Sequence, residues 1–251
     1  MATDFYKYHA LGNDYIVIDP NKVKLPLEEK AIKLICDRNF GIGSDGILYG
    51  SIITEEKIEL RIFNPDGSEA EKSGNGIRIF SRYLVDAEYV KSKNFHLTTL
   101  GGEVAVELLN PEATLIKVDM GTVTFQSELI PVAGSPRQMV DTNLQVDDLS
   151  LKVTCLSIGN PHCVIPVPEV NREIAGSLGA KIENHPLFPK RINVQFLQVR
   201  DRQNIQIEIW ERGAGYTLAS GSSSCAAASA AYKLGLVDDK VKVHMPGGEI
   251  D

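Results

Sequence analysis

The sequence predicts an α/β (α+β) protein of two pseudo-symmetric lobes, each a barrel-like set of strands around a central helix. Two junctions, residues 73–76 (SGNG) and 220–223 (SGSS), each place a serine before a glycine at the start of a helix. The order strand, helix, strands, junction, helix, strands occurs twice, with a break near 119–123. We therefore expect lobes of residues 1–119 and 120–251. Because clefts between lobes commonly hold small ligands, we expect the site between them.

In the first lobe, strands are expected where short apolar runs alternate or end at turn residues, at 3–8, 15–19, 47–49, 57–63, 95–99, 103–109 and 113–119. Residues 28–38 carry one apolar helical face, and the helix 76–87 is apolar around most of its circumference, which predicts burial. The polar insert 11–14 is typical of a hairpin turn or site loop. The glycine-rich loop 39–46 precedes a strand, so it fits neither dinucleotide-binding nor P-loop patterns.

The second lobe repeats this series. Strands are expected at 124–125, 138–140, 151–157, 193–199, 205–210 and 241–244, and a turn at 159–162 runs into a further buried strand. Helices are expected at 169–178 and 223–234. The second of these is rich in alanine and serine, and its small side chains let it approach the surrounding strands closely.

Composition excludes several classes of protein. A net charge of −7 without any basic run argues against nucleic-acid binding. No apolar stretch approaches the ~20 residues of a membrane span, and the N-terminal residues lack the pattern of a signal peptide. We expect a cytoplasmic protein without membrane partners. The four cysteines and five histidines form none of the usual metal-binding spacings, so no metal site is expected.

The two junctions suggest a site for an anion. Glycine and small polar residues at a helix N-terminus leave backbone N–H groups available to a carboxylate. One such junction is more often an ordinary helix cap, because serine and asparagine are preferred caps. Two matched junctions favour a site. Two helix N-termini around one carboxylate, with an ionisable group on each face, suit removal and return of an α-proton. Thiols suit this exchange, whereas a serine hydroxyl is too weak an acid.

Six segments together resemble the diaminopimelate epimerase family. They are residues 11–19 (LGNDYIVID), 38–48 (RNFGIGSDGIL), 63–78 (FNPDGSEAEKSGNGIR), 159–164 (GNPHCV), 192–196 (INVQF) and 210–228 (WERGAGYTLASGSSSCAAA). Each segment is weakly specific, but six in the family's order are highly specific, and the resemblance runs from residue 5 to the end. It implies two lobes with strands around a central helix, two cysteines as acid and base, a small amino-acid substrate, no cofactor and no metal, and a homodimer.

The resemblance also implies roles for individual residues. Ser73 and Ser220 stand at the two catalytic cysteine positions. Residues that would hold the carboxylate at the reacting carbon are Gly74, Asn75, Gly221 and Ser222. Other substrate-binding positions are matched by Asn13, Asn64, Asn160, Asn193 and Arg212, where the arginine can grip a carboxylate with two hydrogen bonds. Glu211 and His162 match residues that assist the catalytic groups and bind the substrate ammonium. Taken singly, the asparagines fit turns or caps, and His162 fits a core histidine.

Departures from the family pattern are few. Both catalytic cysteines are serine within otherwise preserved surroundings, which favours an engineered loss of turnover over a natural serine-bearing relative. Residues 221–224 (GSSS) replace the commoner Gly-Thr-Gly form, and Gly46 stands where some members carry glutamine. Family members usually continue past residue 251 through a terminal hairpin, so we expect the last strands to be missing, as in a truncated chain or a short relative.

The leading hypothesis is therefore a scaffold for interconversion of LL- and meso-diaminopimelate, with little or no turnover. Related two-thiol racemases act on proline, hydroxyproline or histidine, so a different substrate is one alternative. Another is a natural amino-acid-binding protein without catalysis. A carboxylate-based isomerase related to phenazine biosynthesis, using Glu69 or Glu71, is disfavoured by the full set of binding residues.

Overall fold

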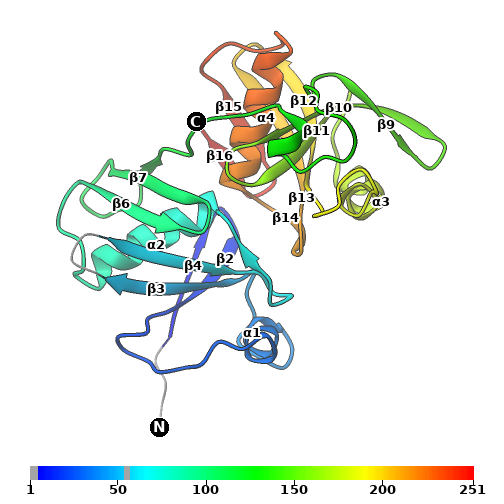
Figure 1. Ribbon diagram of the computed structural model, residues 1–251. Coiled ribbons are helices and arrows are strands. Elements are labelled where there is room, and N and C mark those ends of the chain that lie inside the picture. The colour runs from blue at the N-terminus through cyan, green and yellow to red at the C-terminus, as the bar shows by residue number, and fades with distance from the viewer. Residues whose placement is uncertain (1–4, 54–56) are drawn as a thin grey trace. The chain divides into compact units, whose positions relative to one another are not determined.

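The computed structural model describes residues 5–53 and 57–251 (Figure 1). It divides into two compact units, Met1–Gly121 and Thr122–Asp251. The boundary predicted after residue 119 lies just before this division. Within the described residues, no helix is both long and apolar enough to cross a membrane.

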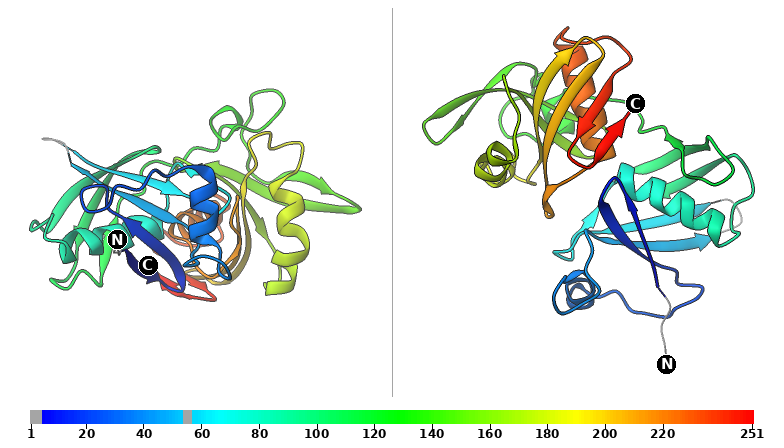
Figure 2. Two further views of the ribbon diagram at one scale, coloured as in Figure 1. Left: turned by 90° about the horizontal axis from the view of Figure 1, so that it is seen from below. Right: turned by 180° about the vertical axis from the view of Figure 1, so that it is seen from behind.

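The first unit contains one mixed sheet in the order β1-β2-β3-β4-β6-β7-β8, with β5 paired to β4. The strands are β1 (Tyr6–Ala10), β2 (Asn13–Ile18), β3 (Ile47–Ile53), β4 (Ile58–Phe63), β5 (Glu69–Ala70), β6 (Asn94–Thr99), β7 (Gly102–Leu108) and β8 (Ile116–Val118). Helix α2 (Gly74–Asp86) contacts β1 and β8, the two ends of this order, so the sheet curls around it (Figures 1 and 2).

Strand β2 is buried on both faces, which explains its continuous apolar run. Tyr15 and Val17 belong to the core around α2, whereas Ile16 and Ile18 pack in a second cluster with α1 (Glu29–Cys36). Alternate side chains of a strand point to opposite faces, so α1 covers the outer face of the sheet and α2 fills the inner one. The central helix predicted for this lobe is confirmed.

The second unit repeats the plan in the order β16-β15-β13-β12-β11-β10-β9, with β14 paired to β13. Its strands are β9 (Thr142–Val146), β10 (Leu149–Ser157), β11 (Pro161–Pro166), β12 (Asn193–Asp201), β13 (Asn204–Glu211), β14 (Gly215–Thr217), β15 (Lys242–Met245) and β16 (Gly248–Ile250). Helix α4 (Gly221–Lys233) contacts β10 to β13. Helix α3 (Arg172–Glu183) contacts β12, β13 and β14, and its buried apolar side chains belong to a hydrophobic core cluster with Val194 and Phe196 of β12. Two parallel pairings recur as well, β2 with β3 across α1, and β11 with β12 across α3.

Several predicted boundaries are wrong. Residues 124–125 and 138–140 form no strands but only isolated bridges, Thr124 with Ser157 and Gln126 with Gln138. Strand β9 was not predicted. Helix α3 begins three residues after the predicted 169, because the Asn171 side chain caps it by accepting from the backbone N–H of Ile174 at 2.9 Å.

The first hairpin also differs from expectation. Its turn is Leu11-Gly12, with φ of 54° and 83°, so Asn13 and Asp14 begin β2 instead of lying in the turn. Asn13 is therefore buried in a strand, with 2% of its surface exposed. Residues 3 and 4 of the predicted first strand lie outside the described residues.

Candidate functional site

The first junction places Ser73 as the N-cap of α2. Its Oγ accepts a hydrogen bond from the backbone N–H of Gly76 at 3.0 Å, and its backbone is extended (φ −138°, ψ 115°). Gly74, Asn75 and Gly76, which form the first turn, are all buried. The hydroxyl of Tyr15 lies 3.2 Å from Ser73 Oγ. The side chain at position 73 thus meets one backbone and one side-chain hydrogen-bonding group.

The second junction has the same geometry. Ser220 is the N-cap of α4 (φ −151°, ψ 124°), and its Oγ accepts from the backbone N–H of Ser223 at 3.3 Å. Ser222 Oγ lies 3.4 Å from Ser220 Oγ, and both residues are buried. The helix-cap interpretation is confirmed at both junctions. It does not exclude an acid–base site, because the same N–H donors and the helix dipole would stabilise a thiolate at either position.

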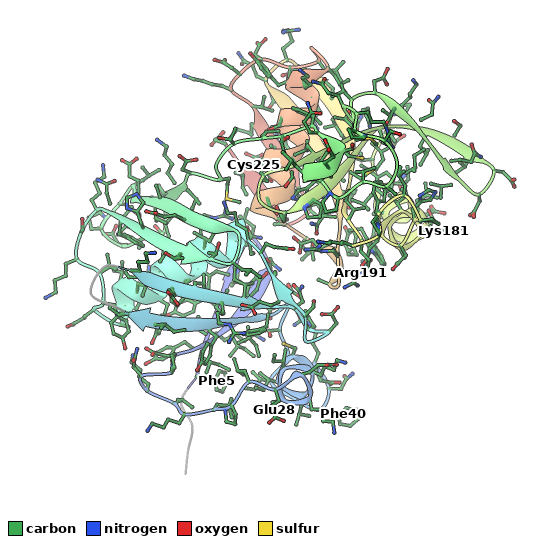
Figure 3. The ribbon with its side chains drawn as sticks, in the orientation of Figure 1. Phe5, Glu28, Phe40, Lys181, Arg191 and Cys225 are labelled. Atoms are coloured by element: carbon green, nitrogen blue, oxygen red, sulfur yellow. The ribbon has the colours of Figure 1, made fainter. Side chains whose placement is uncertain are left out.

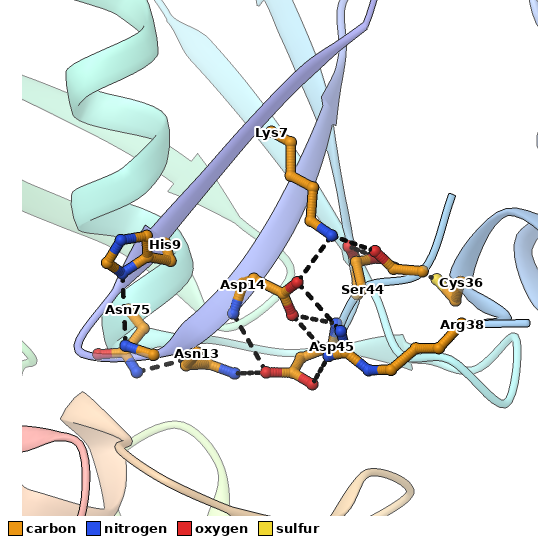
Figure 4. Close-up of polar contacts among 12 residues, drawn as sticks. Lys7, His9, Asn13, Asp14, Cys36, Arg38, Ser44, Asp45 and Asn75 are labelled. Atoms are coloured by element: carbon orange, nitrogen blue, oxygen red, sulfur yellow. Dashed lines mark hydrogen bonds and ion pairs between the residues drawn. The ribbon is translucent and has the colours of Figure 1, made fainter. Parts of the chain in front are cut away.

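Four polar side chains form a continuous row beside the first junction, and Figure 4 shows three of them, Asn75, Asn13 and Asp45. The guanidinium of Arg78 donates to Asn75 Oδ1, and Asn75 Nδ2 donates to Asn13 Oδ1 at 3.0 Å. Asn13 Nδ2 in turn donates to Asp45 Oδ2 at 2.9 Å. The predicted residues Asn13 and Asn75, distant in the sequence, are therefore in direct contact.

Asp14 lies at the centre of an ion-pair cluster beside this row. It pairs with Arg38 at 2.7 Å and with Lys7 at 3.0 Å, and Arg38 also reaches Asp45 at 2.6 Å (Figure 4). Burial acts to raise the pKa of Asp14, but the hydrogen bonds from Arg38 and Lys7 outweigh it and lower the pKa to about 2. The cluster holds the loop before β3 against the start of β2.

Asn64 lies apart from this row. Its Nδ2 donates to Ser68 Oγ at 3.0 Å, and its backbone N–H donates to the Ser68 carbonyl at 2.8 Å. Both bonds close the Pro-Asp-Gly turn after β4. The structure therefore gives Asn64 the turn role that its sequence context predicts.

Several buried polar side chains surround the second junction. His162 Nε2 lies 3.0 Å from Asn160 Oδ1, and Asn160 Nδ2 donates to Ser222 Oγ at 3.4 Å. Gln195, on β12, donates to Ser223 Oγ at 3.0 Å. Burial lowers the pKa of His162 to about 3, although the nearby Gln195 side chain acts to raise it, so the imidazole is neutral near pH 7.

The remaining predicted residues gather at the end of β13. Asn193 Nδ2 donates to the Pro161 carbonyl at 2.8 Å, and Asn193 Oδ1 accepts from the backbone N–H of Arg212 at 3.0 Å. The guanidinium of Arg212 reaches the Lys190 carbonyl at 3.3 Å. Glu211 ends β13 opposite Gly215 of β14. Asn193 thus ties β11 to the segment that carries Glu211 and Arg212.

The sequence interpretation missed Tyr15, Asp45, Arg78 and Gln195, all of which contact predicted site residues. Tyr15 was detectable, because alternation along β2 places it on the face that meets the central helix. Gly46 makes room for its ring, since a Cβ there would lie 2.7 Å from Tyr15 Cε1 and 2.6 Å from the Phe63 carbonyl oxygen. Asp45 and Gln195 carry no local signal, because their partners are distant in the sequence. Arg78 was detectable, because it lies three residues after Asn75 on the predicted helix, a spacing at which side chains meet.

All four cysteines lie in the described part of the chain, and none of them forms a disulfide bond. Cys36, Cys155 and Cys163 are buried, and Cys225 on α4 is partly exposed (Figure 3). Cys155 on β10 and Cys163 on β11 are opposite one another in the register of these two antiparallel strands. None of the four occupies position 73 or 220, so the two helix caps carry hydroxyl groups in place of thiols.

Comparison with known proteins identifies the family. The family model for diaminopimelate epimerase matches residues 5–126 and 154–251. This chain belongs to the diaminopimelate epimerase family. It is 57% identical over 247 residues to diaminopimelate epimerase 2 of Nostoc sp. (strain PCC 7120), a match that covers 98% of this chain and 86% of the relative. It is 42% identical over 252 residues to diaminopimelate epimerase of Methanothermobacter thermautotrophicus, covering 98% and 88%.

Solved structures share the fold of this diaminopimelate epimerase family member. A probable proline racemase from Agrobacterium radiobacter matches with a TM-score of 0.74 at 16% identity, covering 98% of this chain and 82% of that one. A hydroxyproline epimerase from Agrobacterium vitis matches with a TM-score of 0.72 at 13% identity, covering 97% and 80%. The predicted family and two-lobe fold are confirmed, and the chain is homologous to isomerases.

Proposed function

We propose that this chain is a diaminopimelate epimerase scaffold that binds its amino-acid substrate but turns it over slowly or not at all. The observation that carries the proposal is the close relationship to the Nostoc epimerase combined with serine at both acid–base positions. In this proposal the protein is a cytoplasmic homodimer of lysine and cell-wall precursor synthesis that uses no cofactor.

The two helix N-termini would bind the carboxylate at the reacting carbon. The first-turn backbone N–H groups of Gly74 and Asn75 on α2, and of Gly221 and Ser222 on α4, would supply the hydrogen bonds. The asparagines at 13, 64, 160 and 193 and the guanidinium of Arg212 would also bind the substrate, several of them at its distal amino-acid end, where Arg212 would bind a carboxylate. Glu211 and His162 would assist the groups at 73 and 220 and receive the substrate ammonium.

Serine changes the chemistry at the two proton-transfer positions. Epimerisation needs a base on one face of the α-carbon and an acid on the other, exchanging roles with direction. A cysteine thiol has a pKa near 8.5, and helix N-termini lower it further. A serine hydroxyl forms no useful anion near neutral pH without an activating base. We therefore expect binding without appreciable proton transfer.

Calorimetry with LL- and meso-diaminopimelate tests the binding proposal. Arg212→Met should weaken binding at least tenfold, because it removes a charge-assisted contact of about 1.5–3 kcal/mol. Arg202→Met is the matched control, because Arg202 is an exposed arginine in an ion pair with Asp238. Its affinity should equal that of the unmodified chain.

Proline, hydroxyproline and histidine serve as competing ligands in the same experiment. Binding of one of these without binding of diaminopimelate would transfer the proposal to another substrate class. Absence of binding to every ligand would contradict it.

A natural binding protein without catalysis is the second candidate. It is favoured by the regular N-cap geometry at both serines, because Ser73 and Ser220 satisfy backbone N–H groups as a selected cap would. The gene decides between the two: serine codons at 73 and 220 in the source genome support the binding protein, and cysteine codons support an engineered enzyme.

A further inference from the structure

The row Arg78–Asn75–Asn13–Asp45, here called the amide row, has a fixed direction. An asparagine amide can turn over and exchange its oxygen and nitrogen, which reverses its donor and acceptor. Arg78 can only donate, so it faces Asn75 Oδ1. Asp45 as a carboxylate can only accept, so it faces Asn13 Nδ2. Opposite groups at the two ends therefore select one orientation for both amides.

The two ends are themselves anchored. Asp45 Oδ1 accepts from Arg38 at 2.6 Å, and Asp45 Oδ2 also accepts from the backbone N–H of Asp14 at 3.1 Å (Figure 4). Arg78 lies one turn into α2 and reaches the Gly74 carbonyl at 3.4 Å. The loop before β3 is thereby connected, through Asn13, to the first turn of α2.

Burial makes this orientation costly to lose. Asn13 and Asn75 have 2% and 1% of their surface exposed, so water cannot readily replace a lost partner. Reversing either amide would place two donors or two acceptors against each other. In a buried network, a mismatch of this kind costs more than an ordinary hydrogen bond contributes.

We propose that Asp45 and Arg78 are positioning residues of the ligand site, acting by fixing the amide orientation of Asn13 and Asn75. This inference rests on the proposed function, which assigns those two asparagines to the amino-acid substrate. In this inference Asp45 and Arg78 do not themselves contact the substrate. They decide which side-chain amide atoms of Asn13 can meet the ligand, and they fix the side chain of Asn75, whose backbone N–H is assigned to the carboxylate.

A double-mutant cycle measured by calorimetry with meso-diaminopimelate tests the inference. Asp45→Ala should weaken binding about tenfold, the equivalent of one orienting hydrogen bond of about 1.4 kcal/mol. In an Asn13→Ala background the same change should have almost no further effect, because Asp45 acts through Asn13. Equal effects in both backgrounds would overturn the inference.

Arg78 is tested in parallel with a conservative rescue. Arg78→Leu should weaken binding about tenfold, and Arg78→Lys should recover most of the loss, because lysine can still donate to Asn75 Oδ1. The matched controls are Arg82→Leu and Asp86→Ala, which break an ion pair at the far end of the same helix. The controls should leave the affinity for meso-diaminopimelate unchanged. An equal loss of affinity in the controls would show that Asp45 and Arg78 affect binding only through the stability of the fold, which would overturn the inference.

Side-chain amide NMR of the ligand-free chain separates this inference from the proposed function. Signals of Asn13 and Asn75, assigned through Asn→Ala variants, should move in both Asp45→Ala and Arg78→Leu and stay in place in the two controls. Unmoved amide signals would refute the amide row. Absence of diaminopimelate binding by the unmodified chain would instead refute the proposed function.

Discussion

Two glycines in α3 provide a sharp test of how closely this helix packs. A Cβ at Gly179 would lie 2.5 Å from Trp210 Cγ and 2.6 Å from Cδ2, whereas a Cβ at Gly176 would meet nothing within 4 Å. Alanine in a helix interior is favoured over glycine by about 1 kcal/mol at either position. The two substitutions therefore share the same propensity gain and differ only in packing.

The expected difference follows from the overpacking cost. Forcing extra atoms into a packed core costs about 1–3 kcal/mol, and contacts this short with a rigid ring put Gly179→Ala near the upper end. We expect Gly176→Ala to raise the free energy of unfolding by about 1 kcal/mol and Gly179→Ala to lower it by about 2 kcal/mol.

Urea unfolding followed by tryptophan fluorescence measures both variants. Trp210 is the only tryptophan in the chain, so the signal reports the unit that contains α3. Equal stabilisation by both substitutions would refute the close contact between α3 and Trp210. It would also weaken the account of the β13 end, where Trp210 immediately precedes Glu211 and Arg212.

Two further predictions concern titrating groups near the first junction. Because the folded-state pKa of Asp14 is lowered to about 2, its ion pairs with Arg38 and Lys7 contribute stability that is complete above about pH 4 and lost between about pH 4 and 2. Acid unfolding of Asp14→Asn should show a shallower loss over that interval than the unmodified chain, and identical profiles would contradict the assignment. In a Ser73→Cys chain the hydroxyl of Tyr15 should donate to the thiolate, so adding Tyr15→Phe should raise the thiol pKa by about one unit. The pH dependence of iodoacetamide labelling of that peptide measures the pKa, and an unchanged value would exclude the contact.

The sequence predicted the repeated architecture because each lobe signals it locally. Apolar runs bounded by turn or polar residues located β2, β12 and β13, and a serine before a glycine located the start of both central helices. Boundaries failed where tertiary contacts decide them. Asn13 was expected in a turn, but the Leu11-Gly12 turn frees it to enter β2, and its partners Asp45 and Asn75 become visible only in the fold.

The candidate site was predictable as a set of positions and less so as a set of contacts. The junctions and the family resemblance located Ser73, Ser220 and the asparagines. The core position that His162 was expected to occupy is confirmed by its complete burial, but the lowering of its pKa is a consequence of the fold that the sequence does not reveal. The contact of Arg78 with Asn75 follows from an i,i+3 helical spacing that the sequence contains, but its link onward to Asn13 and Asp45 depends on the fold.

Proton exchange at the α-carbon tests the central claim most directly. The unmodified chain and its Ser73→Cys/Ser220→Cys variant would be incubated with LL-diaminopimelate in deuterated water, and deuterium incorporation followed by mass spectrometry. The account predicts little or no incorporation by the serine chain and ready incorporation, with formation of the meso isomer, by the cysteine variant. A cysteine variant that binds diaminopimelate yet exchanges no proton, or a serine chain that exchanges it equally fast, would contradict the account.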